Sequence, residues 1–183
     1  MANTRSILFT AAGNDRPGLT ASFLSILYKH NANVEESYTK VLHSQFSMIL
    51  VASFPHSLSI NSLKEDLAKL EESTGFYINF QEIDTKKTAE THFKQIYMIN
   101  VIGADRPGIM YAVSNLLAKK QINITNTESR VITLNTETPI YIMNFEIQIP
   151  EDVDVEDFST KLTNLGKDLE VDISIKPIEI YNL

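Results

Sequence analysis

The spacing of apolar residues changes several times along this chain, and each change predicts a different element of secondary structure. Mostly apolar runs at residues 7–12 and 96–102 predict buried strands. After each run the apolar positions recur three or four residues apart, beginning at Leu19 and at Ile109, which predicts two amphipathic helices. Alternation of apolar and polar residues within 140–149 predicts a strand with one buried face.

The remaining patterns complete one order of elements, and the order occurs twice. They predict mostly polar strands at 34–41 and 123–131, third strands at 46–54 and 140–149, second helices at 60–70 and 155–169, and last strands at 76–80 and 171–175. The order strand, helix, strand, strand, helix, strand predicts the α+β class in its ferredoxin-like βαββαβ form. We therefore expect two antiparallel sheets, each with its helices on one face.

The chain also repeats a short motif. Gly13-Asn14-Asp15-Arg16-Pro17-Gly18-Leu19 recurs 90 positions later as Gly103-Ala104-Asp105-Arg106-Pro107-Gly108-Ile109. The second copy carries five extra residues within a polar stretch at 133–139, so later counterparts lie 95 positions apart. The repeat predicts a first domain at 1–85, a linker at 86–92 and a second domain at 93–183. Because the first strand of each copy is apolar on both faces, we expect another sheet, from the other copy or another subunit, to cover its helix-free side.

Composition and charge narrow the possible functions. The 183 residues include 16 Lys and Arg against 23 Asp and Glu, a net charge of −7, which disfavours direct binding to nucleic acid or to an anionic membrane. The chain has no cysteine, which excludes disulfides, thiolate nucleophiles and cysteine-ligated zinc. Its four histidines share no repeated position, so we expect neither a metal nor any other cofactor. The apolar run near the N-terminus is too short for a signal peptide, and we expect a cytoplasmic protein.

The repeated loop is the motif with chemical content. Each copy joins a strand to the start of a helix, where free N–H groups and the helix dipole attract a carboxylate or phosphate. Gly18 and Gly108 allow a ligand to approach the backbone, and Asp15 and Asp105 offer a carboxylate to an ammonium group. The combination suits a zwitterionic amino acid. Asn33 and Asn123 begin the following strands and offer both a donor and an acceptor.

Purely structural roles compete with this interpretation. Asp15 and Asp105 are suitable helix caps, the glycines can serve packing alone, and Asn33 and Asn123 suit turns. Arg16 and Arg106 suit either solvent or pairing with a nearby acid.

Two other chemistries use a loop of this kind between a strand and a helix. A nucleotide-binding P-loop is excluded because Leu19 stands where lysine is required and Pro17 lacks an N–H. An acylphosphatase-like site, which uses an arginine in this loop and an asparagine on the next strand, would employ Arg16 and Asn33.

The apolar strand, the Gly-x-Asp-Arg-Pro-Gly-[Leu/Ile] loop, the amphipathic helix and the following asparagine together resemble the ACT domain, and both copies show the pattern. A chain of two such domains is similar to the glycine cleavage system transcriptional repressor family. The resemblance implies a non-catalytic, amino-acid-responsive regulator that controls transcription indirectly, by binding a LysR-type activator protein, with glycine or serine as ligand and a homodimer as the assembly.

The resemblance also implies that the ligand sits between this loop and a neighbouring domain. The implied ligand-binding residues are Asn14, Asp15, Gly18 and Leu19 in the first copy, Ala104, Asp105, Gly108 and Ile109 in the second, and Asn33 and Asn123 nearby. The alternatives are an acylphosphatase-like small hydrolase and an ACT module that mediates assembly without a ligand.

Overall fold

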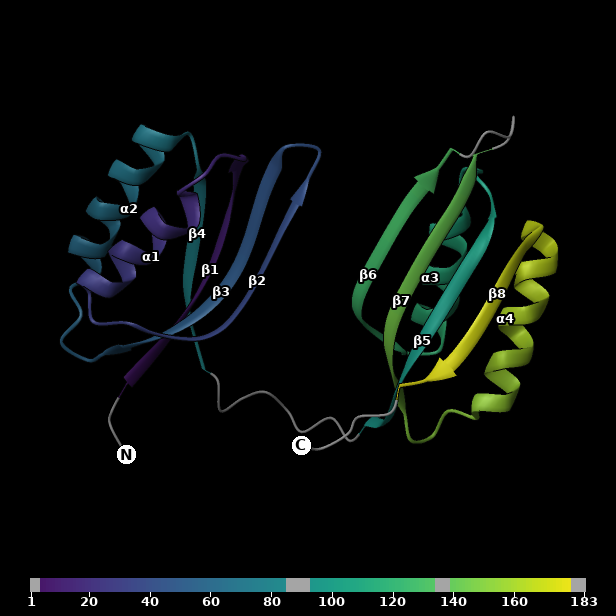
Figure 1. Ribbon diagram of the computed structural model, residues 1–183. Helices are drawn as coiled ribbons and strands as arrows, with labels where there is room; N and C mark the ends of the chain where they lie inside the picture. Colours follow the sequence, from purple (N-terminus) through teal and green to yellow (C-terminus); the bar gives the residue numbers. More distant parts are fainter. Residues whose placement is uncertain (1–3, 85–92, 134–138, 179–183) are drawn as a thin grey trace. The chain divides into compact units, whose positions relative to one another are not determined.

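The computed structural model describes residues 4–84, 93–133 and 139–178. The chain divides into two compact units, residues 1–89 and 90–183, which are drawn in Figure 1 and are described separately below. The expected linker at 86–92 lies outside the described residues, and so does most of the expected insertion at 133–139.

Each unit has the predicted order of elements. The first comprises β1 (Thr4–Asn14), α1 (Leu19–Lys29), β2 (Asn33–Leu42), β3 (Gln45–Pro55), α2 (Ile60–Thr74) and β4 (Tyr77–Ile83). The second comprises β5 (Phe93–Ala104), α3 (Ile109–Lys119), β6 (Asn123–Ile132), β7 (Ile140–Pro150), α4 (Val155–Leu169) and β8 (Val171–Pro177).

Both sheets are antiparallel and have matching strand orders, β2-β3-β1-β4 and β6-β7-β5-β8. The prediction of two ferredoxin-like α+β units is confirmed.

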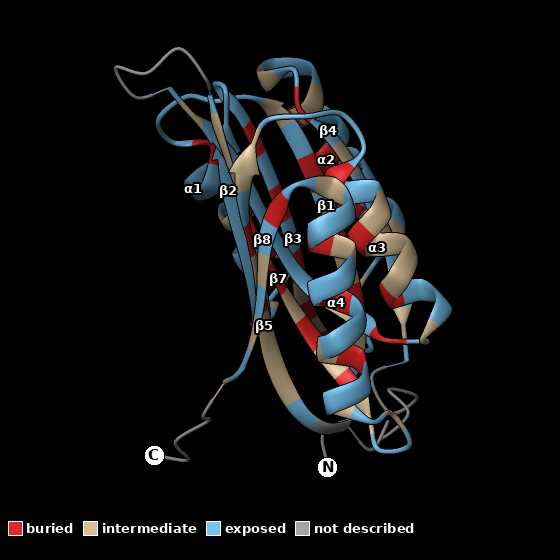
Figure 2. Cartoon of the chain, turned by 90° about the vertical axis from the view of Figure 1, so that its right-hand side faces the viewer, coloured by how far each residue is buried: buried red, intermediate tan, exposed pale blue. Residues whose placement is uncertain are grey.

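The core of each unit lies between the sheet and its two helices. Buried residues gather on the inner faces of these layers in Figure 2. Phe9 on β1 is fully buried, and its ring lies 5.5 Å from that of Phe23 on α1 in an edge-to-face arrangement. Burying one such side chain contributes about 1.5–3 kcal/mol to the free energy of folding. Because apolar residues alternate with polar ones along the strands, the apolar side chains gather on one face of the sheet, and the helices pack on that face.

The other face of the first sheet is partly open to solvent. Tyr38 on β2, Ile49 on β3 and Tyr77 on β4 are 51%, 44% and 72% exposed. The prediction that another sheet covers this face stays a prediction.

The second helix of each unit begins at a capping side chain. The hydroxyl of Ser59 accepts a hydrogen bond from the Ser62 N–H, and the carboxylate of Asp154 accepts bonds from the N–H groups of Glu156 and Asp157. Asp154 thus fixes the start of α4 one residue before Val155, where the spacing of apolar residues predicts the helix to begin. In the described parts of the chain, no helix is both long and apolar enough to span a membrane.

Candidate functional site

The repeated loop forms a corner between β1 and α1 in the first unit, and the adjoining β2–β3 turn holds it in place. The Asp15 N–H donates a hydrogen bond to the Ser44 carbonyl at 2.8 Å. The Asn14 Oδ1 accepts a hydrogen bond from the Gln45 Nε2 at 2.7 Å. The loop motif does not reveal these two contacts, because Ser44 and Gln45 lie about thirty residues further along the chain.

Gly18 gives this corner its open side. It precedes the first residue of α1 with φ of 92°, a left-handed conformation that glycine adopts without strain. A Cβ built on Gly18 would meet nothing within 4 Å. The first N–H groups of a helix have no partner within it, and no side chain caps this helix. Asp15 is exposed and does not cap α1, so the structure removes one of the competing interpretations.

The second unit repeats this geometry. Gly108 has φ of 96°, lacks neighbours around a built Cβ and starts α3 without a side-chain cap. Asp105 is exposed, and its N–H donates to the Pro139 carbonyl at 3.2 Å. Ala104 stands where the first unit has Asn14, so the second corner lacks that side-chain amide. The two corners share a backbone geometry and differ in side-chain chemistry.

The residues after the two glycines serve the core. Leu19 and Ile109 are 3% and 2% exposed, so their side chains pack inward. Only the backbone N–H of each can face a ligand at the corner.

The glycines that open the two motifs have a different role from Gly18 and Gly108. A Cβ on Gly13 would lie 2.7 Å from a ring carbon of Phe76, and one on Gly103 would lie 2.5 Å from the Val171 Cγ1. Both separations are far below a van der Waals contact. Gly13 and Gly103 are therefore required by close packing. Gly18 and Gly108 are required by their left-handed backbone conformation.

The arginines of the motif bind the corner to the end of the second helix. A guanidinium N–H of Arg16 donates to the Ser73 carbonyl at 3.2 Å, in the last turn of α2. Arg106 forms an ion pair of 2.5 Å with Glu170, directly after α4. Positive charge is favourable at the carbonyl end of a helix. These contacts confirm pairing of Arg106 with an acid and give Arg16 a carbonyl partner.

Asn33 does not join the corner of its own unit. Asn33 lies opposite Ser53 on β3, and Ser53 lies opposite Ser6, eight residues before Asn14 on β1. At about 3.3 Å per residue, the two ends are roughly 26 Å apart. The expectation that Asn33 lies near the corner is therefore wrong within the unit, because α1 carries the chain back to the start of β1.

Asn123 is placed in the same way in the second unit. It lies opposite Gln148, which lies opposite Ile96, eight residues before Ala104. Its Nδ2 donates to the Gln148 Oε1 at 3.2 Å. By the same geometry Arg16 and Asn33 lie at opposite ends of their sheet, so a unit by itself does not assemble the acylphosphatase-like pair.

An open hollow of about 390 Å³ lies beside the second corner. Gly103, Lys167, Glu170 and Asp172 are among the residues that line it. Its charged residues lie around the end of α4 and the start of β8. They belong to no motif that the two copies share, so the sequence pattern did not indicate them. Among the described residues, no group of three or more histidines and acids is placed to hold a metal ion.

Comparison with known proteins bears on both units. Models described as the ACT domain match residues 5–81 and residues 97–156. The UPF0237 protein MK1213 of Methanopyrus kandleri is 35% identical over 82 residues, 44% of this chain and 90% of that protein. The UPF0237 protein lin0537 of Listeria innocua is 34% identical over 85 residues, 46% of this chain and 91% of that protein. These relatives are thus about as long as one unit.

Two solved structures span both units. An unknown protein from Galdieria sulphuraria superposes with a TM-score of 0.82 and 26% identity, covering 97% of this chain and 100% of its own. A protein named as a candidate glycine cleavage system transcriptional repressor superposes with a TM-score of 0.68 and 17% identity, covering 97% and 99%. At 17% identity the second likeness concerns the fold alone.

Proposed function

Because this chain belongs to the ACT-domain family of regulatory proteins, we propose that it is a non-catalytic protein that binds a small amino acid and thereby controls a partner protein. The observation that carries the proposal is the corner that occurs twice in one chain, open at Gly18 and at Gly108. A capping role does not require the same exposed acid and the same uncapped helix start in both units.

The polarity of each corner matches that of an amino acid. The free N–H groups at the start of α1 and α3 attract the carboxylate of the ligand. The exposed carboxylates of Asp15 and Asp105 attract its ammonium group. The proposal takes glycine or serine as the ligand, because the likeness to the repressor family implies a small amino acid. Asn14 and Ala104 make the corners unequal, and we expect the first to bind more tightly.

The partner in this proposal is a protein. A net charge of −7 disfavours phosphate backbones and is compatible with a protein partner. The likeness to the repressor family implies a LysR-type activator, and the proposal adopts it, with a cytoplasmic setting. The ligand binds the free protein and the partner-bound protein with different affinities. The change that it causes in the affinity for the partner equals this difference, which is typically 1–3 kcal/mol.

Calorimetry on the full chain tests the ligand. Glycine, serine and other small amino acids are titrated into the wild-type chain and into the variant Asp15→Asn/Asp105→Asn, which keeps the shape and removes the charge. We expect millimolar or tighter binding of at least one amino acid, weakened about tenfold in the variant. Asp152→Asn, a change in the exposed turn before α4, is the matched control and leaves the affinity unchanged.

The other outcomes separate the alternatives. If no amino acid binds at millimolar concentration, the chain is an assembly module without a ligand. If the chain hydrolyses an acyl phosphate and Arg16→Ala abolishes the activity, it is an enzyme. If an amino acid binds but never changes the affinity for a purified LysR-type activator, the ligand part of the proposal stands and the partner is a different protein.

A further inference from the structure

The helix-free face of the first sheet carries a hollow of about 300 Å³. Tyr38 and Tyr77 stand on the two edge strands, β2 and β4, and the smaller side chains of the central strands lie between them. The residues of this hollow on which the argument rests are Thr10, Ala12, Tyr38, Ser47, Ile49 and Tyr77.

The strand register places these residues in two adjacent rows across the sheet. Tyr38 lies opposite Ile49, which lies opposite Thr10. Ser47 lies opposite Ala12, which lies opposite Tyr77. The edge strands are three strand spacings apart, roughly 14 Å. Two tyrosines thus form walls on either side of a floor made of small side chains.

None of the described residues that line this hollow is charged. Glu36 and Lys40 lie two positions to either side of Tyr38, so this edge of the face has no net charge. Tyrosine is enriched and charged residues are depleted at the centres of protein interfaces. The hollow has that composition, and it is unsuited to a zwitterion.

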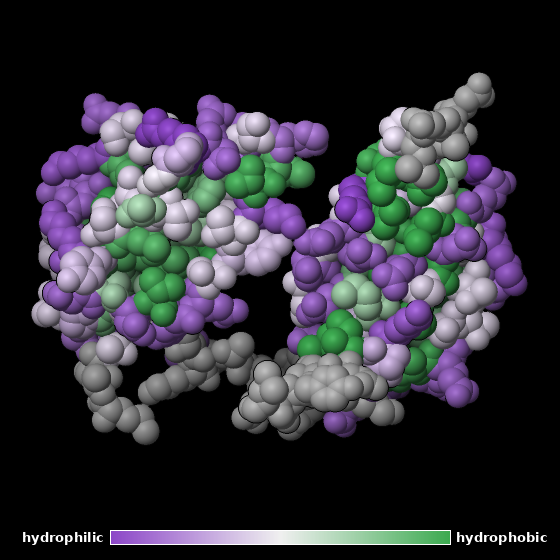
Figure 3. Space-filling model, viewed as in Figure 1, coloured by the Kyte–Doolittle hydropathy of each residue, from purple (hydrophilic) through white to green (hydrophobic). Residues whose placement is uncertain are grey.

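The second unit shows that the fold does not require this surface. At the same register positions Glu128 replaces Tyr38, Asn144 replaces Ile49 and Asp172 replaces Tyr77. Figure 1 shows α3 behind the sheet of the second unit, and Figure 3 shows polar and apolar residues interspersed over the face in front. Two homologous sheets in one chain therefore differ in the chemistry of the same face.

We propose that a second copy of this chain docks on the tyrosine-walled face of the first unit, sheet against sheet about a two-fold axis. The two-fold axis lets the tyrosines of each copy enter the hollow of the other. Self-association of a chain with a net charge of −7 is favoured where no charge must be desolvated. No described residue that lines the hollow of the first unit is charged, and Glu36 and Lys40 beside it carry opposite charges, whereas the corresponding face of the second unit would bury Glu128 and Asp172 at its centre.

The size of the face also fits a second copy. With β1 and β3 each 11 residues long, the face is roughly 36 Å by 14 Å, or about 1,000 Å² for two copies together. That value reaches the lower limit for a specific protein interface. We therefore expect a dimer in the micromolar range rather than an obligate one. The first corner adjoins this face, because Ala12 lies two residues before Asn14 on β1. None of the residues implied in ligand binding lines the hollow, so the inference stands whether or not an amino acid binds.

Sedimentation equilibrium of the full chain from about 1 to 100 µM tests the dimer. The test variant is Tyr38→Glu/Tyr77→Asp, which introduces the residues that the second unit carries at the same positions of an intact sheet. The control is Tyr28→Glu/Tyr111→Asp, which adds the same charge at tyrosines that are 84% and 73% exposed on α1 and α3. We expect dimers of the wild type and of the control, and at least tenfold weaker association of the test variant.

A second measurement does not depend on those substitutions. Because the chain has no cysteine, Ala12→Cys places a single thiol in the hollow. A short bis-maleimide should link two copies of this variant and should not link two copies of Tyr28→Cys. A wild type that stays monomeric over the whole range, or equal cross-linking of the two cysteine variants, overturns the proposal. A test variant that folds and dimerises like the wild type also overturns it.

Discussion

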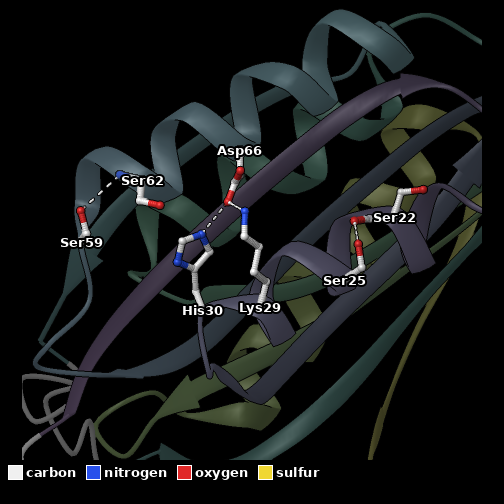
Figure 4. Close-up of polar contacts among 7 residues, drawn as sticks. All are labelled: Ser22, Ser25, Lys29, His30, Ser59, Ser62 and Asp66. Atoms are coloured by element: carbon white, nitrogen blue, oxygen red, sulfur yellow. Dashed lines mark hydrogen bonds and ion pairs between the residues drawn. The ribbon is translucent and has the colours of Figure 1, made fainter.

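The Nε2 atom of His30 lies 2.9 Å from a carboxylate oxygen of Asp66, and this contact joins the end of α1 to α2 (Figure 4). The Nζ of Lys29 lies 2.7 Å from the same oxygen. Their hydrogen bonds, Lys29 foremost, hold the pKa of Asp66 below its ordinary value of 3.8. In the second unit the counterpart of Asp66 is Lys161, which pairs with Asp157 one turn earlier on α4, and the Nζ of Lys120 at the end of α3 lies 3.6 Å from the same carboxylate. In both units a cation at the end of the first helix thus pairs with an acid on the second helix, but the acid stands at a different position of that helix.

The lowered pKa of Asp66 predicts how the stability of the first unit depends on pH. Its folded pKa is below the unfolded one, so the stabilisation is complete above the unfolded pKa and is lost as the pH falls through the folded pKa. We expect Asp66→Asn to lower the free energy of unfolding at pH 7. The difference from the wild type should shrink progressively below about pH 4.

Urea denaturation of both proteins between neutral and acidic pH measures this difference. Asp152→Asn, in an exposed turn, should give no difference at any pH. An Asp66→Asn effect of equal size at pH 3 and pH 7 would show that the carboxylate acts through its shape and not through its charge.

The two kinds of glycine in the motif should respond differently to alanine. Gly18→Ala places a Cβ in open space but forces a left-handed conformation, which costs about 1–2 kcal/mol. Gly13→Ala brings its Cβ against Phe76, and such overpacking costs about 1–3 kcal/mol.

A double-mutant cycle distinguishes the two causes. Combining Phe76→Leu with Gly13→Ala should cost less than the sum of the single changes, because the smaller side chain relieves the contact. Combining it with Gly18→Ala should be additive. Equal coupling in both cycles would contradict the division of roles between the two glycines.

The twelve helices and strands were predictable from the chain because side-chain burial in this fold follows simple periods. On β3 every second residue from Phe46 to Phe54 is buried, and on α1 the buried residues are Leu19, Phe23 and Leu27. Because the same order of elements occurs twice, the pattern in one copy supports the prediction made for the other. A cap such as Asp154 is also a local feature, because it acts on residues two and three positions away.

The residues that come together at the candidate site were less predictable, because they depend on where each helix or strand ends in three dimensions. Asn33 lies close to the motif in sequence, yet the 11 residues of α1 separate it from Asn14 by the length of the sheet. The contact between His30 and Asp66 joins positions 36 residues apart and has no counterpart of the same chemistry in the other copy. Neither the spacing of apolar residues nor the repeated motif shows that these two side chains meet.

The β2–β3 turn beside the first corner should gain stability from glycine. His43 and Ser44 have φ of 47° and 60°, the left-handed values of a two-residue turn that favours glycine at its second position. We expect Ser44→Gly to raise the free energy of unfolding by about 0.5–1 kcal/mol. Its carbonyl still accepts the Asp15 N–H, so the corner keeps its support.

Ser47→Gly is the matched control for this prediction, because position 47 lies within β3. Glycine inside a strand should lower the free energy of unfolding by about 0.5–1 kcal/mol. Chemical denaturation of the two variants should therefore give changes of opposite sign. A loss of stability in Ser44→Gly would mean that the serine side chain has a role beyond its backbone conformation.

The separation of Asn33 from the corner predicts which asparagine contributes to ligand affinity. Asn14 is exposed at the corner, and removing one hydrogen-bonding group costs about 0.5–1.5 kcal/mol, or roughly two- to tenfold in affinity. We expect Asn14→Ala to weaken amino-acid binding by that factor in calorimetry, whereas Asn33→Ala and Asn123→Ala leave it unchanged. Ala104→Asn should strengthen binding at the second corner, because it restores the missing amide. Loss of binding in Asn33→Ala with full binding in Asn14→Ala would place the ligand at the opposite end of the sheet.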